Sequence, residues 1–484
     1  MNPRRDRSDR GQYDCRVHRR EIREELCLAS LSEVFAALPS PAILGGNAAK
    51  ASADGFSYWA GEPREVFEFT AGDGDPFPAL ELILNRYVLA SEYAGGHIVG
   101  PPSTPTFCGG WIGYFSYELG RCIERLPGTT IDDLHTPLIR LSFYDRVIAY
   151  DHAGGTTWMI VVELPHDHES PEEKLACLER HLERSRRVRV PPPPLAPLEA
   201  GGLRDTPGNM SRAEYLRAVR RVKEYIRNGE VYQVNLSQRL ELPFAGRPLD
   251  LFHWQNRHNP SGYAAYLDTG RFKIVSASPE MFIAMHNGQI RTKPIKGTRP
   301  RLAGDEPDAS RLNRERFEDL LSSEKERAEL NMIVDLERND LARICQPGTR
   351  HVVQPRTIET YPTVYHAVAT IGGQLRAGIR FSEILRAMFP GGSITGAPKI
   401  RAMEIIEELE PTARGVYTGS IGFLSLNGDV CLNIAIRTVI IASRLALVQV
   451  GGGIVADSDP VAEWDETLTK ARALLTGIRA VASR

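Results

Sequence analysis

Three strand-like segments in the C-terminal part of this 484-residue chain constrain the fold most strongly. They cover residues 419–426, 430–441 and 445–450 and are rich in β-branched and other apolar residues. The first two are separated by Asn427-Gly428, a dipeptide typical of tight β-hairpins. Strands joined by such a short turn run antiparallel. The region therefore predicts an antiparallel β-meander.

Helical segments are interleaved with the expected strands. Ser211 precedes an amphipathic stretch that reaches Ile226, Glu214 stands three residues after it, and Gly229 follows. This arrangement is a capping-box start with a glycine stop. Further helices are expected over residues 170–187, 314–344, 381–388, 398–410 and 460–482. Strand pairs between long helices favour an α+β fold, in which helices cover antiparallel sheets.

Composition divides the chain into four regions. Residues 1–28 are polar and arginine-rich, which predicts a disordered tail. Residues 29–187 contain short strand-like runs between glycine and proline turns. Residues 188–210 are rich in proline and glycine, which predicts a stiff linker. Residues 211–484 carry the helices and the meander described above.

Charge and cysteine usage exclude several protein classes. The net charge is -2, from 59 basic and 61 acidic side chains, and gives no support for a nucleic-acid or membrane-surface partner. The 7 cysteines are scattered and form no Cys-x-x-Cys pair. This pattern suits a reducing cytoplasm and disfavours a disulfide framework or a structural zinc site. Neither a transmembrane-length apolar run nor a signal-peptide core is expected.

Lys296 is the first candidate for chemistry. It lies between Ile295 and Gly297 in the segment Arg-Thr-Lys-Pro-Ile-Lys-Gly-Thr-Arg. A lysine that is desolvated loses its proton and becomes a nucleophile. The alternative is an exposed lysine on a loop, which is the usual state of a lone lysine.

Two pairs of glutamates have helical spacing. Glu326 and Glu329 stand three apart in one expected helix, and Glu463 and Glu466 stand three apart in another, so each pair shares one helix face. Each pair alone suits a solvated acidic surface. Two pairs that face one cleft would form an oxygen-rich magnesium site completed by water and an anionic substrate. Lys470, one turn after Glu466, would then lie near metal and substrate.

Other segments offer groups that could hold a small dianion. Arg437 lies in the expected strand 432–438, where a buried guanidinium needs a carboxylate partner from protein or ligand. Glycines 451–453 let backbone N–H groups approach an anion closely. His366 is either a core histidine or a site residue. Residues 391–399 are glycine-rich but lack the Gly-Lys-Ser/Thr ending of a phosphate-binding loop.

Several long segments together resemble the chorismate-utilising enzymes, the family of anthranilate, aminodeoxychorismate, isochorismate and salicylate synthases. The resemblance is strong over residues 211–479 and weaker over residues 31–187. It implies two stacked antiparallel β-sheets flanked by helices, with the active site between them. The matching segments are GEVYQVNLSQR (229–239), SPEMF (278–282), PIKGTRPR (294–301), KERAELNMIVDLERNDL (325–341), FPGGSITGAPKIRAMEIIEELEP (389–411), YTGSIGF (417–423), NIAIRT (433–438) and GGGIVADSDPVAEWDET (451–467).

The resemblance also implies roles for the residues around the substrate ring. Lys296 matches a lysine that attacks C2 of chorismate, and Glu280 matches the general acid that protonates the departing C4 hydroxyl. Ammonia then adds at C4 and the lysine is expelled. Thr298 and His366 match groups near the ring.

The same resemblance assigns the charged groups of the substrate and the metal. Tyr417, Arg437 and Gly451, Gly452 and Gly453 match the carboxylate-binding groups, with Lys470 nearby. Glu329 and Glu466 match the direct Mg2+ ligands, with Glu326 and Glu463 alongside.

Two positions separate the members of the family. Members that add water carry a lysine base where this chain has Gln233, and glutamine cannot act as that base. Anthranilate synthases carry alanine at the position of Lys296. The sequence therefore resembles the aminase component of aminodeoxychorismate synthases, on the route to 4-aminobenzoate and folate. The alternatives are synthesis of anthranilate or 2-amino-2-deoxyisochorismate, or a degenerate relative that serves as a binding or regulatory subunit.

The nitrogen source is expected to lie outside this chain. The sequence has no Gly-x-Cys-x-Gly nucleophile of a glutaminase, so ammonia is expected from solution or from a separate glutamine amidotransferase subunit. Two positions depart from the family pattern. Leu330 replaces a histidine, with little expected effect on catalysis, and Ala42–Gly46 lacks the serine of a tryptophan pocket, which disfavours tryptophan binding.

Overall fold

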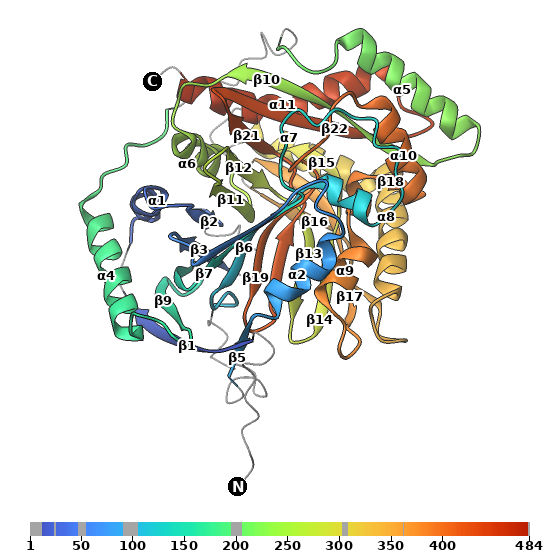
Figure 1. The fold of residues 1–484 in the computed structure, drawn as a ribbon. Helices are drawn as coiled ribbons and strands as arrows, with labels where there is room; N and C mark the ends of the chain where they lie inside the picture. The colour runs from blue at the N-terminus through green and yellow to red at the C-terminus, as the bar shows by residue number, and fades with distance from the viewer. Residues whose placement is uncertain are drawn as a thin grey trace.

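The structure is a computed structural model that describes residues 12–23, 26–46, 55–90, 105–194, 206–302, 308–361 and 363–482. Its strands form two large sheets, and helices lie on their outer sides (Figure 1). Within these ranges, no helix is long and apolar enough to cross a membrane.

The larger sheet has 12 strands, and all neighbours are antiparallel except the last pair. Its order is β18 (Gly396–Ala397), β10 (Gln233–Pro243), β22 (Leu445–Ile454), β21 (Thr438–Ala442), β12 (Lys273–Ser278), β11 (Tyr263–Asp268), β2 (Ala42–Leu44), β3 (Phe56–Ala60), β8 (Arg146–Asp151), β9 (Thr156–Glu163), β1 (Tyr13–Ile22) and β5 (Tyr87–Leu89).

The second sheet has 10 antiparallel strands. Its order is β15 (Ile295–Pro300), β17 (Val364–Gln374), β14 (Gln289–Lys293), β13 (Met281–His286), β20 (Val430–Asn433), β19 (Ser420–Ser425), β6 (Gly110–Phe115), β7 (Ile139–Tyr144) and β4 (Glu65–Phe69), and β16 (His351–Thr360) pairs with β17 as well.

Three apolar layers hold the two sheets and the helices together. One core lies between the sheets and includes Tyr58, Tyr114 and Ile421. A second core packs the 12-stranded sheet against α1 (Leu28–Ala36), α4 (Pro171–Arg187), α5 (Arg212–Arg227), α6 (Pro248–His258), α10 (Lys399–Leu409) and α11 (Pro460–Ala482). On the other side, the 10-stranded sheet is covered by α2 (Pro76–Leu84), α7 (Ala309–Ser322), α8 (Glu324–Ala342) and α9 (Phe381–Met388). The expected α+β sandwich of two stacked sheets flanked by helices is confirmed.

Local sequence signals explain where several helices begin. The side chain of Ser211 caps α5 and forms the expected capping box with Glu214. The expected helix 314–344 is instead two helices, α7 and α8. Ser323 between them is extended (φ -62°, ψ 106°), and its hydroxyl accepts from the N–H of Glu326, so it caps α8. A side chain that caps a helix start favours this break within an otherwise helical pattern.

The predicted tail, residues 1–28, is corrected in its second half. Strand β1 pairs with β9 along seven residues, and Cys15 and Val17 are buried. His18 bonds Glu163 at 2.8 Å, and Arg20 pairs with Glu179. The prediction from polar composition was wrong here, because strand pairing satisfies the backbone N–H and C=O groups whatever the side chains are. Residues 1–11 lie outside the described part.

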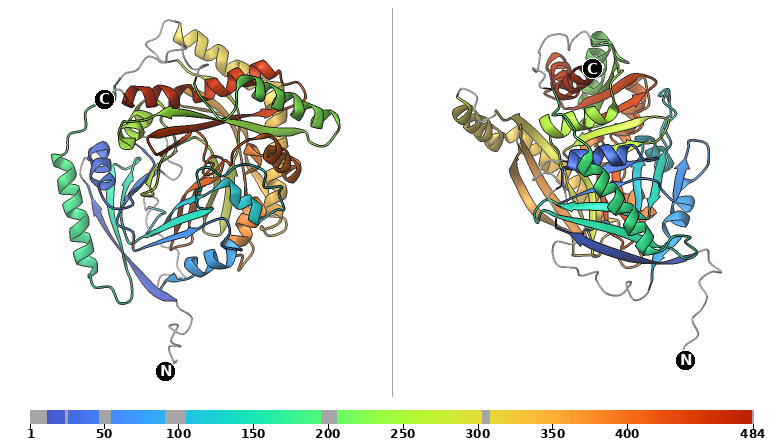
Figure 2. Two further views of the ribbon diagram at one scale, coloured as in Figure 1. Left: turned by 45° about the horizontal axis from the view of Figure 1, so that its top comes forward. Right: turned by 90° about the vertical axis from the view of Figure 1, so that its left-hand side faces the viewer.

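Both sheets combine strands from the two large regions of the chain. Strands from residues 29–187 continue the 12-stranded sheet beyond β11 and the 10-stranded sheet beyond β19. Figure 2 shows these N-terminal strands and the C-terminal strands in shared layers. In the expected linker 188–210, Pro194 accepts a hydrogen bond from the Trp254 indole at 3.1 Å, while residues 195–205 lie outside the described part.

Candidate functional site

Lys296 lies on β15 and points toward a short 3-10 turn, η3 (Gly392–Ile394). Its Nζ donates to the carbonyl of Ser393 at 3.2 Å. The amine is deep in the protein although part of the side chain remains accessible to solvent. Desolvation lowers its pKa, and the carboxylates of Glu329 and Glu280 oppose this effect. A lowered pKa is the property that a nucleophilic lysine requires.

Gly297 makes room for the acidic groups beside Lys296. Its φ is +98°, and a Cβ there would lie 2.8 Å from Oε2 of Glu326 and from Cδ1 of Leu320. Glycine is therefore required by both backbone conformation and space. The pairing of β15 with β17 shifts register at this point, which turns the lysine out of the regular ladder.

Glu280 lies between β12 and β13 and is buried. The N–H of Ile295 donates to its Oε1 at 3.4 Å. Desolvation raises the pKa of the Glu280 carboxyl, although a hydrogen bond from Ser393 and the nearby Lys296 partly counteract it. A carboxyl with a raised pKa keeps its proton longer and suits a general acid.

His366 and Thr298 face each other across β17 and β15. The Thr298 hydroxyl and His366 Nδ1 are 2.8 Å apart, and the residues are register partners. Burial lowers the pKa of His366 to about 3, with smaller contributions from Arg437 and Lys293. The imidazole is therefore neutral at ordinary pH, and its buried Nε2 has no hydrogen-bond partner within the described part.

Arg437 is not inside a strand, so that part of the prediction was wrong. The expected strand 430–441 ends as β20 at Asn433 in one sheet and restarts as β21 at Thr438 in the other. Arg437 lies in this crossing with φ +48°. Within the described residues its guanidinium has no ion-pair partner, and desolvation lowers its pKa. The sequence shows no sign of this crossing, because the strands on both sides of it, β20 and β21, are buried and apolar.

The three glycines of β22 give space to neighbouring side chains. A Cβ on Gly453 would lie 2.0 Å from Nε2 of Gln233, and one on Gly452 would lie 3.1 Å from Oε2 of Glu463. The carbonyl of Gly451 accepts a hydrogen bond from Lys470 at 2.9 Å. Gln233 is buried, and both polar atoms of its amide lack a hydrogen-bond partner in the described structure. Unpaired buried amides are costly, which points to a bound group that pairs with this one.

Tyr417 precedes β19 and is buried close to this site. Desolvation raises the pKa of its hydroxyl, which therefore remains a hydrogen-bond donor.

The two glutamate pairs lie on α8 and α11 and are mutually close. Glu329 and Glu466 influence each other electrostatically, and both act on Lys296. Desolvation raises the pKa of Glu329 and of Glu463. Burial would also raise the pKa of Glu466, but the Lys470 ammonium, 2.8 Å away, lowers it overall.

The carboxylates are engaged by protein groups. Glu326 pairs with Arg299 at 2.7 Å, and Glu463 accepts from Ser458 at 2.6 Å. Within the described ranges, no three His, Cys, Asp or Glu side chains stand close enough to hold a metal ion. The donor set still fits a hard cation, since all four groups are carboxylates and Oε2 of Glu326 is buried without a hydrogen-bond partner.

Two groups near the site had not been singled out from the sequence. Ser393 contacts both Lys296 and Glu280. It lies in the family-like segment 389–411, but nothing in that segment distinguishes Ser393 from its neighbours. Glu337 is buried on α8, and burial raises its pKa to about 8. Its Oε2 accepts from the Thr292 hydroxyl at 2.8 Å. The sequence signal that could have identified Glu337 is an acidic residue on the apolar, buried face of α8.

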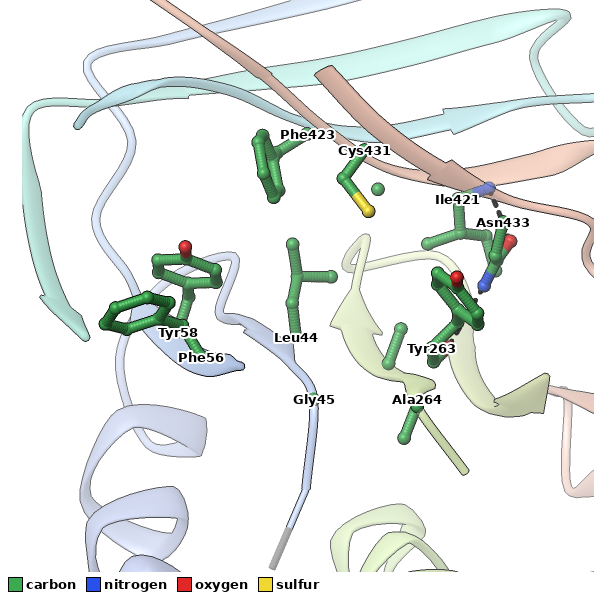
Figure 3. A pocket seen from close by; sticks show the side chains of 13 residues that line it. Leu44, Gly45, Phe56, Tyr58, Tyr263, Ala264, Ile421, Phe423, Cys431 and Asn433 are labelled. Atoms are coloured by element: carbon green, nitrogen blue, oxygen red, sulfur yellow. Dashed lines mark hydrogen bonds between the residues drawn. The ribbon is translucent and has the colours of Figure 1, made fainter. Parts of the chain in front are cut away.

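The two departures from the family pattern lie apart from these groups. Leu330 is fully buried in the core under α8. The segment Ala42–Gly46 borders a cavity of about 40 Å3 between the sheets, lined by Leu44, Tyr58, Tyr263 and Phe423 among others (Figure 3). Such a volume has room for a few water molecules.

Comparison with known proteins decides the family. The model of the chorismate binding enzyme family matches residues 52–476. The chain belongs to the chorismate-binding enzymes. The match crosses both large regions, in agreement with the sheets that they share.

Relatives of this chorismate-binding chain carry two different names. It is 42% identical over 381 residues to anthranilate synthase component 1 of Pseudomonas aeruginosa, covering 78% of this chain and 76% of the relative. It is 40% identical over 370 residues to aminodeoxychorismate synthase component 1 of Bacillus subtilis, covering 76% and 77%. Among solved structures, anthranilate synthase component I from Streptococcus pneumoniae aligns with a TM-score of 0.71 and 31% identity, over 87% of this chain and 92% of that one.

Proposed function

We propose that this chain is the aminase component of an aminodeoxychorismate synthase, which converts chorismate and ammonia to 4-amino-4-deoxychorismate. The observation that carries the proposal is the position of Lys296. Its amine is desolvated, bonds the Ser393 carbonyl, and lies in the electrostatic reach of the buried acid Glu280. A nucleophile and an acid at one site suit the exchange of one ring substituent for another.

In the proposed reaction, Lys296 adds to C2 of chorismate as the C4 hydroxyl leaves. Glu280 gives its proton to that hydroxyl, which departs as water, and the new ammonium adduct loses a proton. Ammonia then bonds to C4 while the C2–nitrogen bond breaks, and the lysine regains the proton that the incoming ammonia gives up. The product feeds formation of 4-aminobenzoate, which leads to folate.

Arg437 and Tyr417 are proposed to hold the carboxylates of the substrate. The Arg437 guanidinium lacks an ion-pair partner in the described structure, and its fork suits a carboxylate. The neutral His366 and its hydrogen-bond partner Thr298 are proposed to contact the substrate ring, with Gln233 and Lys470 as further substrate-binding groups.

Magnesium is proposed as the cofactor. Glu329 and Glu466 would hold it, with Glu326 and Glu463 alongside. Bound there, a hard cation would offset part of the negative charge of the four glutamates and of a substrate carboxylate. Lys470 and Arg299 balance part of this negative charge in the free protein.

The proposed nitrogen donor in the cell is a separate glutamine amidotransferase subunit in the cytoplasm, with ammonia in solution as the alternative. The component 1 name of relatives supports this view.

A second candidate is an enzyme that places nitrogen at C2, making anthranilate or 2-amino-2-deoxyisochorismate. The 42% identity to an anthranilate synthase component 1 favours it. The presence of Lys296 disfavours it, because in the proposed reaction the amine of this side chain bonds to C2, where ammonia would have to add.

Product analysis tests the proposal. The purified chain, with chorismate, Mg2+ and ammonium at pH 8.5, is expected to yield 4-amino-4-deoxychorismate by chromatography and mass spectrometry. Anthranilate or its amino precursor as the main product would establish the second candidate. No conversion of chorismate would contradict both.

A further inference from the structure

Arg414 carries a positive charge at one of the most deeply buried places in the protein. It is 2% exposed and pairs with Glu410, which is 3% exposed. Its Nε and Nη2 donate to the two carboxylate oxygens at 2.9 and 2.7 Å. A buried ion pair persists only where further hydrogen bonds satisfy both groups, so its other contacts matter.

Glu410 ties this pair to the 12-stranded sheet. Its Oε1 also accepts from the N–H and the hydroxyl of Ser237, each at 2.8 Å. Ser237 is on β10 and is the register partner of Gly451, the first of the three site glycines on β22.

The remaining donors of Arg414 hold three segments around the site. Nη1 donates to the carbonyl of Ile394 at 3.1 Å and to the hydroxyl of Thr418 at 3.2 Å. Nη2 donates to the carbonyl of Asn235 at 2.6 Å. The guanidinium also lies 5.9 Å from the ring centre of Tyr417.

The contact with Ile394 leads directly to the reacting groups. Ile394 ends the η3 turn, and its neighbour Ser393 accepts from Lys296 and bonds Glu280. A shift of this turn would therefore move the hydrogen-bond partner of the nucleophile and that of the acid together.

Glu118, from the N-terminal half, holds the backbone of Arg414 from the opposite side. Its two carboxyl oxygens accept from the N–H groups of Arg414 and Gly415 at 2.7 and 2.9 Å. The neighbouring Tyr117 ring lies 4.6 Å from the Arg414 guanidinium. Residues of the N-terminal half thus contact both the backbone and the guanidinium of Arg414.

We infer that Arg414, held by Glu410 and Glu118, is a positioning residue that fixes the η3 turn and Tyr417, and through Ser393 sets the geometry and basicity of Lys296. The inference rests on the proposed function for its effect on turnover. Arginine suits this role because its planar fork presents five donors at once, whereas lysine has one nitrogen.

The test replaces Arg414 by lysine and measures Lys296 directly. Reaction of Lys296 with a small amine reagent is followed against pH by peptide mass spectrometry. Loss of the Ser393 acceptor destabilises the charged amine, so the pKa of Lys296 is expected to fall by about one unit in Arg414→Lys. Labelling below that pKa becomes about tenfold faster, and kcat falls between about tenfold and a hundredfold.

Arg239→Lys is the matched control. Arg239 is also buried, with 4% of its surface exposed, and it pairs with Asp133 and Glu241. It lies on β10, away from Lys296. It should leave the labelling profile of Lys296 unchanged. Glu118→Gln leaves the Arg414–Glu410 ion pair in place and removes one of the two oxygens that hold the backbone of Arg414 and Gly415. This variant serves if Arg414→Lys does not fold, and the same direction of change is expected. Wild-type labelling and kcat in a folded Arg414→Lys or Glu118→Gln variant would overturn the inference. If the wild-type protein makes a product other than 4-amino-4-deoxychorismate, the proposed function is contradicted, but the labelling result for Lys296 still stands.

Discussion

At the scale of single residues, burial shifts the pKa values of the groups proposed to react with the substrate. Desolvation lowers the pKa of Lys296 and of His366, and it raises the pKa of Glu280. All three shifts move these groups toward their neutral forms, which suits proton exchange with a substrate. Water at the same positions would keep the amine and the carboxyl charged.

Replacement of Lys296 by alanine tests its role as nucleophile. Without ammonia, the wild-type protein with chorismate is expected to gain mass on the peptide that contains Lys296, and Lys296→Ala should lose this adduct. Formation of 4-amino-4-deoxychorismate should fall by about a thousandfold. Some ammonia addition at C2 is expected in the vacated space. Lys273→Ala, on β12 and paired with Asp268, is the control that should keep wild-type activity. If Lys296→Ala forms 4-amino-4-deoxychorismate at the wild-type rate, Lys296 is not the nucleophile and has only a structural role.

Glu337 predicts a pH-dependent stability. Burial raises the pKa of its carboxyl from 4.5 to about 8 in the folded protein. The stability that its neutral form contributes is therefore fully present below about pH 4.5 and is lost as pH rises through about 8. Glu337→Gln removes this titration. Between pH 6 and 9 the free energy of unfolding of the variant should therefore rise relative to that of the wild type, by an amount on the order of 1 to 3 kcal/mol. Urea unfolding at several pH values measures this difference.

The exposed Glu318 on α7 supplies the control for that comparison. Glu318→Gln should follow the wild-type pH dependence. A constant difference between Glu337→Gln and the wild type from pH 6 to 9 would show that Glu337 is already ionised in the folded protein.

At the scale of elements, α8 and α11 bring the two acidic pairs to one place. Each helix presents its pair on one face because residues three apart are neighbours there. The loop before α11 also contributes, since Ser458 orients Glu463. The cap at Ser323 fixes where α8 begins and so which face carries Glu326 and Glu329.

Removal of the cation or of its carboxylates is expected to stop turnover. Excess chelator should abolish activity, and added Mg2+ should restore it. Glu329→Gln and Glu466→Gln should each lower kcat by at least about a hundredfold with an unchanged far-UV spectrum, because one ligand and one charge are lost. Glu324→Gln, at the exposed start of α8, should behave as the wild type. Full activity in chelator would contradict a metal site built from these residues.

At the scale of the whole molecule, the two large regions complete each other's sheets. The site lies mainly on elements after residue 211, yet Glu118 reaches it from the N-terminal half.

The nitrogen source is a prediction about the whole chain. Purified alone, it should use ammonium salts, with rates that rise with pH as free ammonia increases, and it should ignore glutamine. Addition of a cognate amidotransferase should restore glutamine use. Isotope-labelled glutamine and ammonium distinguish the two routes in the product. Glutamine-dependent turnover by the single chain would contradict this prediction and would reveal a glutaminase nucleophile within the chain.

The sequence alone determined the class of the fold, and it selected most of the residues proposed for the site. Capping signals placed α5, the Asn427-Gly428 turn placed β19 and β20, and long family-like segments selected Lys296, Glu280 and the glutamates. These features are local, or are carried by contiguous motifs, so one stretch of sequence contains them.

Only the tertiary structure decided how the motifs meet. The crossing at Arg437 moves the chain from one sheet to the other inside an apolar run, and β1 is held by β9, more than a hundred residues away. Ser393 and Arg414 matter through contacts with residues distant in sequence. Such pairings depend on which strands become neighbours and on which charges are buried together, and hydrophobic periodicity in one segment carries no information about either.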